Sequence, residues 1–368
     1  MPIYMDRHDV SKDVTAEIVA DLHQKDLKIQ HKFSCKGLTY WFDEQRKTAF
    51  CLVEAPSRAA IKQMHDQAHG EVPHRIIEVD HAVVESFLGR IEDPEKSRKT
   101  SLNIINDPAF RSLMIAGLQP STLKQTLDKK VRFHIADHLN KISDRILQLQ
   151  GRLVRQEQEQ LLVSFDSVSN AVNCAMELRK EFIKDFPLPD SPVRLKVGLS
   201  AGVPVDEKQG LFETTIHTAA TFYRLAAGTL VMSSEVRELY DSENAGSPLS
   251  PGSVVSLSPS EEKFLRDLWA YTEQEGSNSS LNIHALSRAL GFSRSGLYRT
   301  MLQLTGQSPN SFLKEYRLRR ALLLLQKRGM NISEVAFETG FSSPAYFSKC
   351  FHENFGILPS RYLRHSVS

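Results

Sequence analysis

The 368-residue sequence lacks three features that would assign it to a special class of protein. It has no run of the roughly 18 to 20 consecutive apolar residues that cross a bilayer, and its first ten residues, MPIYMDRHDV, lack the apolar core of a signal peptide. It has only four cysteines, too few and too scattered for a disulfide framework. We therefore expect a cytoplasmic protein with free thiols and no membrane contact.

The whole chain also lacks a large net charge of either sign, but its two parts carry opposite net charges. The whole chain carries 46 basic and 44 acidic side chains. Residues 281–368 hold 12 basic and 4 acidic side chains, a net charge of +8, which leaves 34 and 40, a net charge of −6, in residues 1–280. This asymmetry indicates a basic module that meets a polyanion, joined to a part with another task. The length itself predicts two or three domains.

Composition and periodicity divide the chain into a multidomain protein with a linker. Residues 246–260 contain eleven Gly, Pro or Ser, which interrupts helix and strand patterns, and Ser258 with Glu261 forms a capping-box pattern that starts a helix. A second seam lies in the polar segment 90–100. We predict a first domain at 1–90, a second at 105–242, a linker at 243–259 and a third domain at 260–368.

The first domain shows the element order βαββαβ. Strands are predicted at 2–8, 37–42, 48–54 and 75–79, and helices at 15–32 and from Ser57 to Gly70. This order is typical of the α+β ferredoxin-like fold. The second domain mixes helices at 127–149, 168–186 and 215–225 with strands at 153, 161–165, 193–201 and 229–233, which predicts an α/β or α+β domain.

The third domain is predicted to be all-α and contains an internal repeat. A short helix at 283–290, the corner Gly291-Phe292-Ser293 and a second helix at 294–304 recur 49 residues later as 332–339, Gly340-Phe341-Ser342 and 343–355. Glycine at each corner permits the left-handed backbone that joins two helices at a steep angle. Two helix-turn-helix units could enter successive DNA major grooves about 34 Å apart.

The segment ISEVAFETGFSSPAYFSKCFHENFGILPSRYLR resembles the signature of AraC/XylS-family transcription regulators, and the resemblance covers residues 260–364. It implies a transcription regulator, either an activator or a repressor, that binds a double-stranded DNA operator as a homodimer and contacts RNA polymerase. Base-facing positions would be Ser295, Tyr298, Arg299, Ala345, Tyr346 and Lys349, and phosphate contacts would be Arg294, Arg317 and Arg361. A solvated charged helix face is the alternative for each single cation. Apolar residues that recur every three or four positions are predicted to form the core of this domain: Leu286, Leu297, Leu313, Ala336, Phe337, Phe347 and Phe351.

Three stretches of the second domain, which begin LLVSFDSVSN, VRLKVGLSAG and GTLVMSSEVR, resemble the class III nucleotide cyclase domain over residues 109–240. The family's two metal-binding aspartates fall on Gly117 and Pro120, its Gly-Asp-Gly hairpin on 158–160, and its late Asn and Arg on His217 and Thr221. Without these groups the phosphoryl chemistry loses its electrostatic stabilisation, so we expect a pseudo-cyclase that dimerises, binds a small ligand or serves as a spacer.

Histidines concentrate in the first domain, where seven of the thirteen occur before residue 82. His65 and His69 are four residues apart on a predicted helix, so their imidazoles share one face and suit Ni²⁺, Zn²⁺ or Cu²⁺. A histidine in the last turn also simply favours the helix dipole. The segments MDRHD, LTYWFDEQRKTAFCLVEAP and MHDQAHG resemble a small ferredoxin-like family with nickel-binding members. That resemblance implies as metal ligands His8, His65 and His69, with Asp6, Cys35 and Cys51 as further candidates.

Together these patterns predict a transcription regulator that a metal ion or a small effector controls through the first two domains. Two rivals belong to other classes: a nucleotide cyclase tethered to DNA, and a metal-buffering protein. Gly117, Pro120, Glu159 and Thr221 argue against the first rival, because they differ from the residues that the cyclase family has at those positions.

Overall fold

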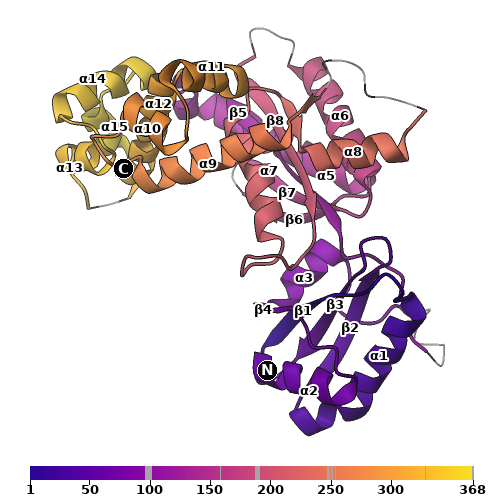
Figure 1. The fold of residues 1–368 in the computed structure, drawn as a ribbon. Coiled ribbons are helices and arrows are strands. Elements are labelled where there is room, and N and C mark those ends of the chain that lie inside the picture. The colour runs from indigo at the N-terminus through magenta and orange to yellow at the C-terminus, as the bar shows by residue number, and fades with distance from the viewer. Residues whose placement is uncertain are drawn as a thin grey trace.

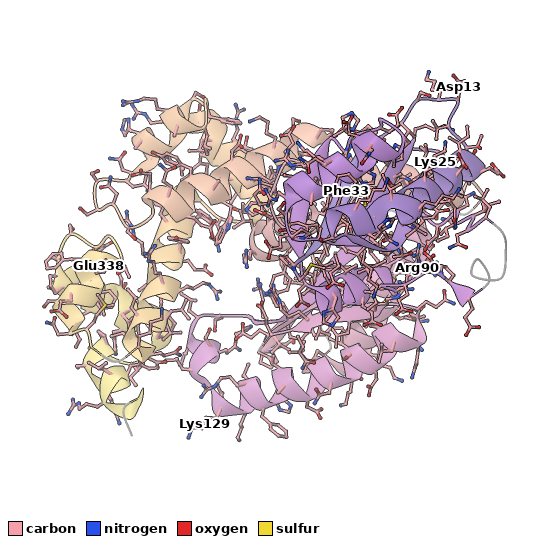
Figure 2. All side chains as sticks on the ribbon, turned by 90° about the horizontal axis from the view of Figure 1, so that it is seen from below. Asp13, Lys25, Phe33, Arg90, Lys129 and Glu338 are labelled. Atoms are coloured by element: carbon pink, nitrogen blue, oxygen red, sulfur yellow. The ribbon has the colours of Figure 1, made fainter. Side chains whose placement is uncertain are left out.

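The computed structural model describes residues 1–95, 102–157, 159–186, 191–246, 249, 252, 254–327 and 329–366. Figure 1 shows three units in chain order, with the N-terminal unit at the bottom, the middle unit above it and the helical unit at the upper left. In the perpendicular view, Phe33 and Lys25 of the N-terminal unit lie far from Glu338 of the helical unit (Figure 2). No helix in the described part of the chain is long and apolar enough to cross a membrane.

The N-terminal unit is a four-stranded antiparallel sheet with the strand order β2-β3-β1-β4. Its elements are β1 (Ile3–Asp9), α1 (Ala16–Ile29), η1 (Gln30–Phe33), β2 (Lys36–Asp43), β3 (Thr48–Glu54), α2 (Arg58–Ala68), β4 (Arg75–Val79) and α3 (His81–Leu88). The predicted ferredoxin-like order is confirmed, because strands that alternate apolar residues bury one face under α1 and α2. Helix α3, absent from the prediction, covers the other face with Val84, Phe87 and Leu88.

The middle unit is a six-stranded mixed sheet with the order β10-β9-β8-β5-β7-β6. Its elements are β5 (Arg111–Pro120), η2 (Lys124–Leu127), α5 (Lys129–Gln148), β6 (Arg152–Gln156), β7 (Gln160–Phe165), α6 (Val168–Asp185), β8 (Val193–Gly202), α7 (Glu213–Leu225), β9 (Leu230–Met232), α8 (Ser234–Glu243) and β10 (Val255–Ser256). The strands β8-β5-β7-β6 repeat the arrangement of the N-terminal sheet, and two parallel strands extend it. Helices α5 and α6 bury one face, and α7 lies against β5 and β8.

The C-terminal unit is helical, as predicted. It comprises α9 (Pro259–Glu275), α10 (Ile283–Ala289), α11 (Arg294–Thr305), α12 (Pro309–Gln326), α13 (Ile332–Glu338), α14 (Pro344–Phe355) and α15 (Pro359–Ser366). The predicted capping box between Ser258 and Glu261 opens α9. The predicted core residues are buried except Phe337, which is 56% exposed, so that assignment is wrong. Helix α13 is only seven residues long, and Val335 and Ala336 already occupy its inward face.

The predicted linker differs from the structure in its last part. Val255 and Ser256 pair with β9, and the amide of Leu257 donates to the carbonyl of Met232 at 3.1 Å. Leu257 then joins a core shared by two units, in which Phe222 and Leu225 of α7 pack with Phe264, Leu265 and Leu268 of α9. Val255 therefore belongs to the sheet and Leu257 to the core, although the Gly, Pro and Ser content of this segment indicates a linker.

Candidate nucleic-acid interface and metal cluster

Helices α11 and α14 are the second helices of the two helix-turn-helix units. Each begins at a serine whose side chain accepts a backbone hydrogen bond, Ser293 from Gly296 at 3.1 Å and Ser343 from Tyr346 at 3.2 Å. The corner glycines have positive φ angles, +73° at Gly291 and +84° at Gly340. Both corners therefore have the backbone conformation that the sequence predicts.

The predicted base-facing side chains lie on the outer faces of these two helices. Every one of them is exposed, with Tyr298 at 46% and Tyr346 at 51%: Ser295, Tyr298 and Arg299 on α11, and Ala345, Tyr346 and Lys349 on α14. The opposite faces are buried through Leu297 and Phe347. Because burial anchors one side of each helix, the other side exposes these residues to solvent.

The three predicted phosphate contacts have different surroundings. Arg294 is exposed at the start of α11, and Arg361 is exposed on α15. Arg317, on α12, is half-buried, and its guanidinium donates to the carbonyls of Gly276 (3.1 Å), Asn278 (2.8 Å) and Leu281 (3.3 Å). Burial lowers its pKa. Arg317 therefore ties α12 to the loop after α9, a role within the protein.

Five side chains of the N-terminal unit form one buried polar cluster beside the sheet. Two of the three predicted metal ligands, His65 and His69, meet Asp26 of α1, a residue that the sequence reasoning missed. Asp26 Oδ1 lies 3.1 Å from His65 Nδ1 and 3.2 Å from His69 Nε2, and the two nitrogens are 3.3 Å apart. The third predicted ligand, His8, lies on the other side of Asp6, whose carboxylate is 3.1 Å from His65 and 3.3 Å from His8.

Ion pairs and hydrogen bonds between histidine and aspartate side chains stabilise this cluster. Burial opposes charge on His65, but hydrogen bonds from its ring to Asp26 and Asp6 outweigh burial and raise its pKa to about 10. Burial raises the pKa of Asp6, but the nearby charges and hydrogen bonds of His8 and His65 outweigh this effect and hold it far below its usual range. The cluster is thus a network of opposite charges that are buried together, which is stable only when every member is partnered.

The atoms of Asp26, His65 and His69 also fit a divalent transition metal. Ligand atoms about 2.0 to 2.1 Å from such a metal lie roughly 3 Å apart, and the three atoms here are separated by 3.1 to 3.3 Å. Asp26 Oδ1 and His8 Nε2 are buried, and among the described residues their polar contacts are the ion pairs with His65, His69 and Asp6 given above. Two imidazoles and a carboxylate suit nickel, copper or zinc.

The cysteine candidates fit a metal less well. Cys51 Sγ lies within 4.8 Å of ligand atoms of Asp6 and His8. Burial raises the pKa of its thiol well above the usual range, and the thiolate is the form that binds metals. Cys35 belongs to neither group of possible ligands found among the described residues, and its thiol lies 3.5 Å from the carbonyl of Phe33. Asp26 could have been suspected from its helical spacing to His23 on a face that α2 covers.

The positions compared with cyclase residues lack a comparable cluster. Neither group of possible metal ligands among the described residues lies in the middle unit. Gly117 is on β5, where an added Cβ would meet the carbonyl of Glu159 at 2.1 Å, and the hydroxyl of Thr221 donates to the carbonyl of His217. Gln158 of the predicted hairpin lies outside the described residues. The resemblance to cyclases stays a prediction.

Comparisons with known proteins find family matches at both ends of the chain. Residues 286–365 match the family described as helix-turn-helix domain, and residues 4–79 match the family described as nickel responsive protein SCO4226-like. Histidine kinase P4 of Formosa agariphila is 37% identical over 110 residues, which cover 30% of this chain and 8% of that protein. The regulator MtrA of Neisseria gonorrhoeae is 35% identical over 81 residues, 22% of this chain and 27% of that protein.

Among solved structures, SCO4226 from Streptomyces coelicolor A3(2) is 30% identical and matches 21% of this chain and 94% of that chain, with a TM-score of 0.20. The two curated relatives above are matched over less than a third of their own length. The two family matches lie in the N-terminal and C-terminal units.

Proposed function

We propose that this chain is a sequence-specific DNA-binding transcription regulator with a metal-responsive N-terminal unit, because residues 286–365 match the helix-turn-helix family and residues 4–79 match the SCO4226-like nickel-responsive family. The observation that carries the first part is the pair of serine-capped helices, α11 and α14, whose outer faces expose the predicted base-reading residues. The matched relatives named as transcriptional regulators agree with it.

Affinity and specificity come from different side chains in this proposal. The net charge of +8 in residues 281–368 supplies attraction to phosphates through counterion release. Arg299 has no described carboxylate within ion-pair distance, so its guanidinium is available for a guanine edge. Arg294 and Arg361 would position the protein on the backbone, and Arg317 would position the helices relative to one another. Binding as a homodimer and contact with RNA polymerase remain part of the proposal through the resemblance.

Arg299→Ala tests the base-reading role. A duplex selected from a random pool by the purified protein would serve as the specific site, and a scrambled duplex as the non-specific one. We expect the specific affinity to fall roughly 10- to 100-fold, which corresponds to about 1 to 3 kcal/mol, with little loss on the scrambled duplex. Arg132→Ala, an exposed arginine on α5, is the control. Equal losses on both duplexes would reject base reading by Arg299.

The second part of the proposal is a metal site held by Asp26, His65 and His69, with His8 and Asp6 beside it. When bound, nickel or a similar ion would supply a fixed positive centre that replaces the mutual contacts of these side chains. Because α1 and α2 each provide ligands, the ion would clamp both helices to the sheet. A metal-buffering protein remains the rival, and DNA binding measured with and without Ni²⁺ separates the two.

Thermal unfolding tests the metal site directly. We expect Ni²⁺ to raise the midpoint of the wild type and of His31→Ala/His81→Ala, two exposed histidines outside the cluster. It should not raise the midpoint of His65→Ala/His69→Ala. Because that variant leaves buried carboxylates unpaired, His69→Gln is measured as well. An equal rise in all four proteins would refute the assignment.

The middle unit is proposed to be a non-catalytic scaffold. The described residues offer no carboxylate pair at the positions of the cyclase metal ligands, since Gly117 and Pro120 occupy them. Incubation of the protein with ATP or GTP and Mn²⁺ checks this, and cyclic nucleotide formation would overturn it.

A further inference from the structure

A large cavity lies between the middle unit and the helical unit. Its volume is about 950 Å³, which is enough for a drug-sized molecule. The middle unit contributes the end of β5, the start of β8 and the ends of α6 and α7. The helical unit contributes α9, the turn between α11 and α12, and α12 itself. The two units meet along α7 and α9 beside it (Figure 1). The amide of Ala227 donates to the carbonyl of Leu304 at 2.8 Å across this boundary.

The cavity lining is strongly basic. Six cations border it, against two carboxylates, Glu273 and Glu315: Arg179, Arg194, Lys196, Arg224, Arg319 and Arg320. Glu315 is already paired with Arg319 at 2.8 Å and accepts from Gln307. Arg179, Arg194 and Arg320 have no carboxylate within ion-pair distance among the described residues. Several cations therefore line one cavity without a paired carboxylate.

Lys196 is the buried member of this set. It lies on β8 with 9% of its surface exposed, and its ammonium donates to the carbonyls of Ala226 and Gly228. Burial and the nearby charge of Arg194 lower its pKa to about 8. This buried ammonium lies near another cation and has no carboxylate within ion-pair distance among the described residues, so a bound anion would stabilise its charge.

The remaining wall is apolar and aromatic. Trp269 of α9 packs edge-on against Tyr316 of α12, with 5.9 Å between ring centroids, and the guanidinium of Arg224 lies over the Trp269 ring at 5.4 Å. Leu195 and Phe312 complete this side. A molecule that fills the cavity must therefore combine negative charge with an apolar or flat body.

We propose that this cavity binds a small organic anion, which carries a phosphate, sulfonate or carboxylate group on an apolar or aromatic body. Arginines from the middle unit and from α12 would hold the charged group, and Trp269, Tyr316 and Phe312 would hold the body. Because both units line the cavity, the ligand would fix α12 relative to the middle sheet. The effect of that on DNA binding rests on the function proposed above, whereas the binding itself does not.

A fluorescent aromatic sulfonate, 8-anilinonaphthalene-1-sulfonate, is the probe, and N-phenyl-1-naphthylamine is its uncharged counterpart. The test variant is Arg194→Gln/Arg320→Gln, and the control is Arg58→Gln/Arg132→Gln, which removes two exposed cations outside the cavity. We expect one sulfonate per chain, with energy transfer from Trp269 that Trp269→Phe reduces. The affinity should weaken about tenfold or more in the test variant only. The uncharged counterpart should bind weakly and equally to both.

Two results would overturn the proposal. Equal sulfonate affinity in the test and control variants would show that the cavity cations do not bind the anion. A loss of affinity for scrambled duplex DNA in the test variant, with unchanged sulfonate binding, would assign these arginines to DNA phosphates. If the chain fails to bind any DNA, the sulfonate result still decides the question of the cavity.

Discussion

The two corner glycines form a matched pair, because they occupy the same position in the two helix-turn-helix units and differ in their surroundings. A Cβ added at Gly340 would lie 2.9 Å from Arg317 Nε and from the carbonyl oxygens of Gly276 and Ser277. A Cβ added at Gly291 would meet nothing within 4 Å. Comparing Gly340→Ala with Gly291→Ala therefore separates the backbone cost from the crowding cost.

The magnitudes follow from these distances. Both positions have positive φ, so alanine costs about 1 to 2 kcal/mol at each. At Gly340 the two carbonyls are backbone atoms that cannot move aside cheaply, and overpacking of this kind adds about 1 to 3 kcal/mol. We expect Gly340→Ala to lower the free energy of unfolding by about 2 to 5 kcal/mol in total. Gly291→Ala should cost only the backbone term.

Hydrogen exchange by mass spectrometry at increasing urea is the assay, because it reports local opening in a multidomain chain that need not unfold in two states. Peptides from α12 to α14 should lose protection in Gly340→Ala, together with the loop at residues 276–281. Specific DNA affinity should fall as well, since this junction sets the angle between the two units. Equal destabilisation by the two substitutions would refute the idea that Gly340 is required for the close approach to Arg317 and Gly276.

Two further predictions concern the middle unit and its boundary. Burial lowers the pKa of Lys196 to about 8, below its value of 10.5 in the unfolded chain. Its contribution to stability is therefore present above pH 10.5 and is lost as the pH falls through 8. The thermal midpoint of the wild type should rise more between pH 7.5 and 9.5 than that of Lys196→Met, and parallel profiles of the two proteins would contradict this. Leu268→Ala should lower the free energy of unfolding by about 2 to 5 kcal/mol and raise hydrogen exchange in α7 and α11 together, because Leu268 is fully buried in the shared core. The control is Leu147→Ala, at a residue of α5 that is 58% exposed. A change in exchange confined to α9 would contradict a shared core.

The sequence predicts local features of this protein well, because caps and corners depend on neighbouring residues. The capping box at Ser258 and the left-handed glycines at Gly291 and Gly340 need only a few residues of context. Identical corners still diverge in three dimensions. Phe341 is 3% exposed and packs on Phe347, whereas Phe292 is 36% exposed at the edge of Phe264.

Features that depend on how elements meet could not be predicted. Asp26 joins the histidine cluster because α1 packs beside α2, a contact between residues about forty positions apart. The cavity arginines come from two units, so no single segment shows a charge pattern that indicates it. Phe337 has core spacing in the sequence, yet the short α13 turns it outward.

The helical domain touches the middle domain at both of its halves. Helix α9 packs on α7, and Leu123 and Leu127 beside or within η2 pack into the core of the second half, against residues that include Phe347, Phe351 and Phe355. The middle unit therefore supports both halves of the helical unit, one with α11 and one with α14, at two separate contacts. A shift of α7 relative to η2 would change the distance between α11 and α14, and under the proposed DNA-binding function this distance would set which half-site spacing the protein accepts. For the same reason, a fragment cut at Ser258 would expose apolar surface on both pieces, so exchange of this domain between proteins requires matching substitutions in α7 and η2.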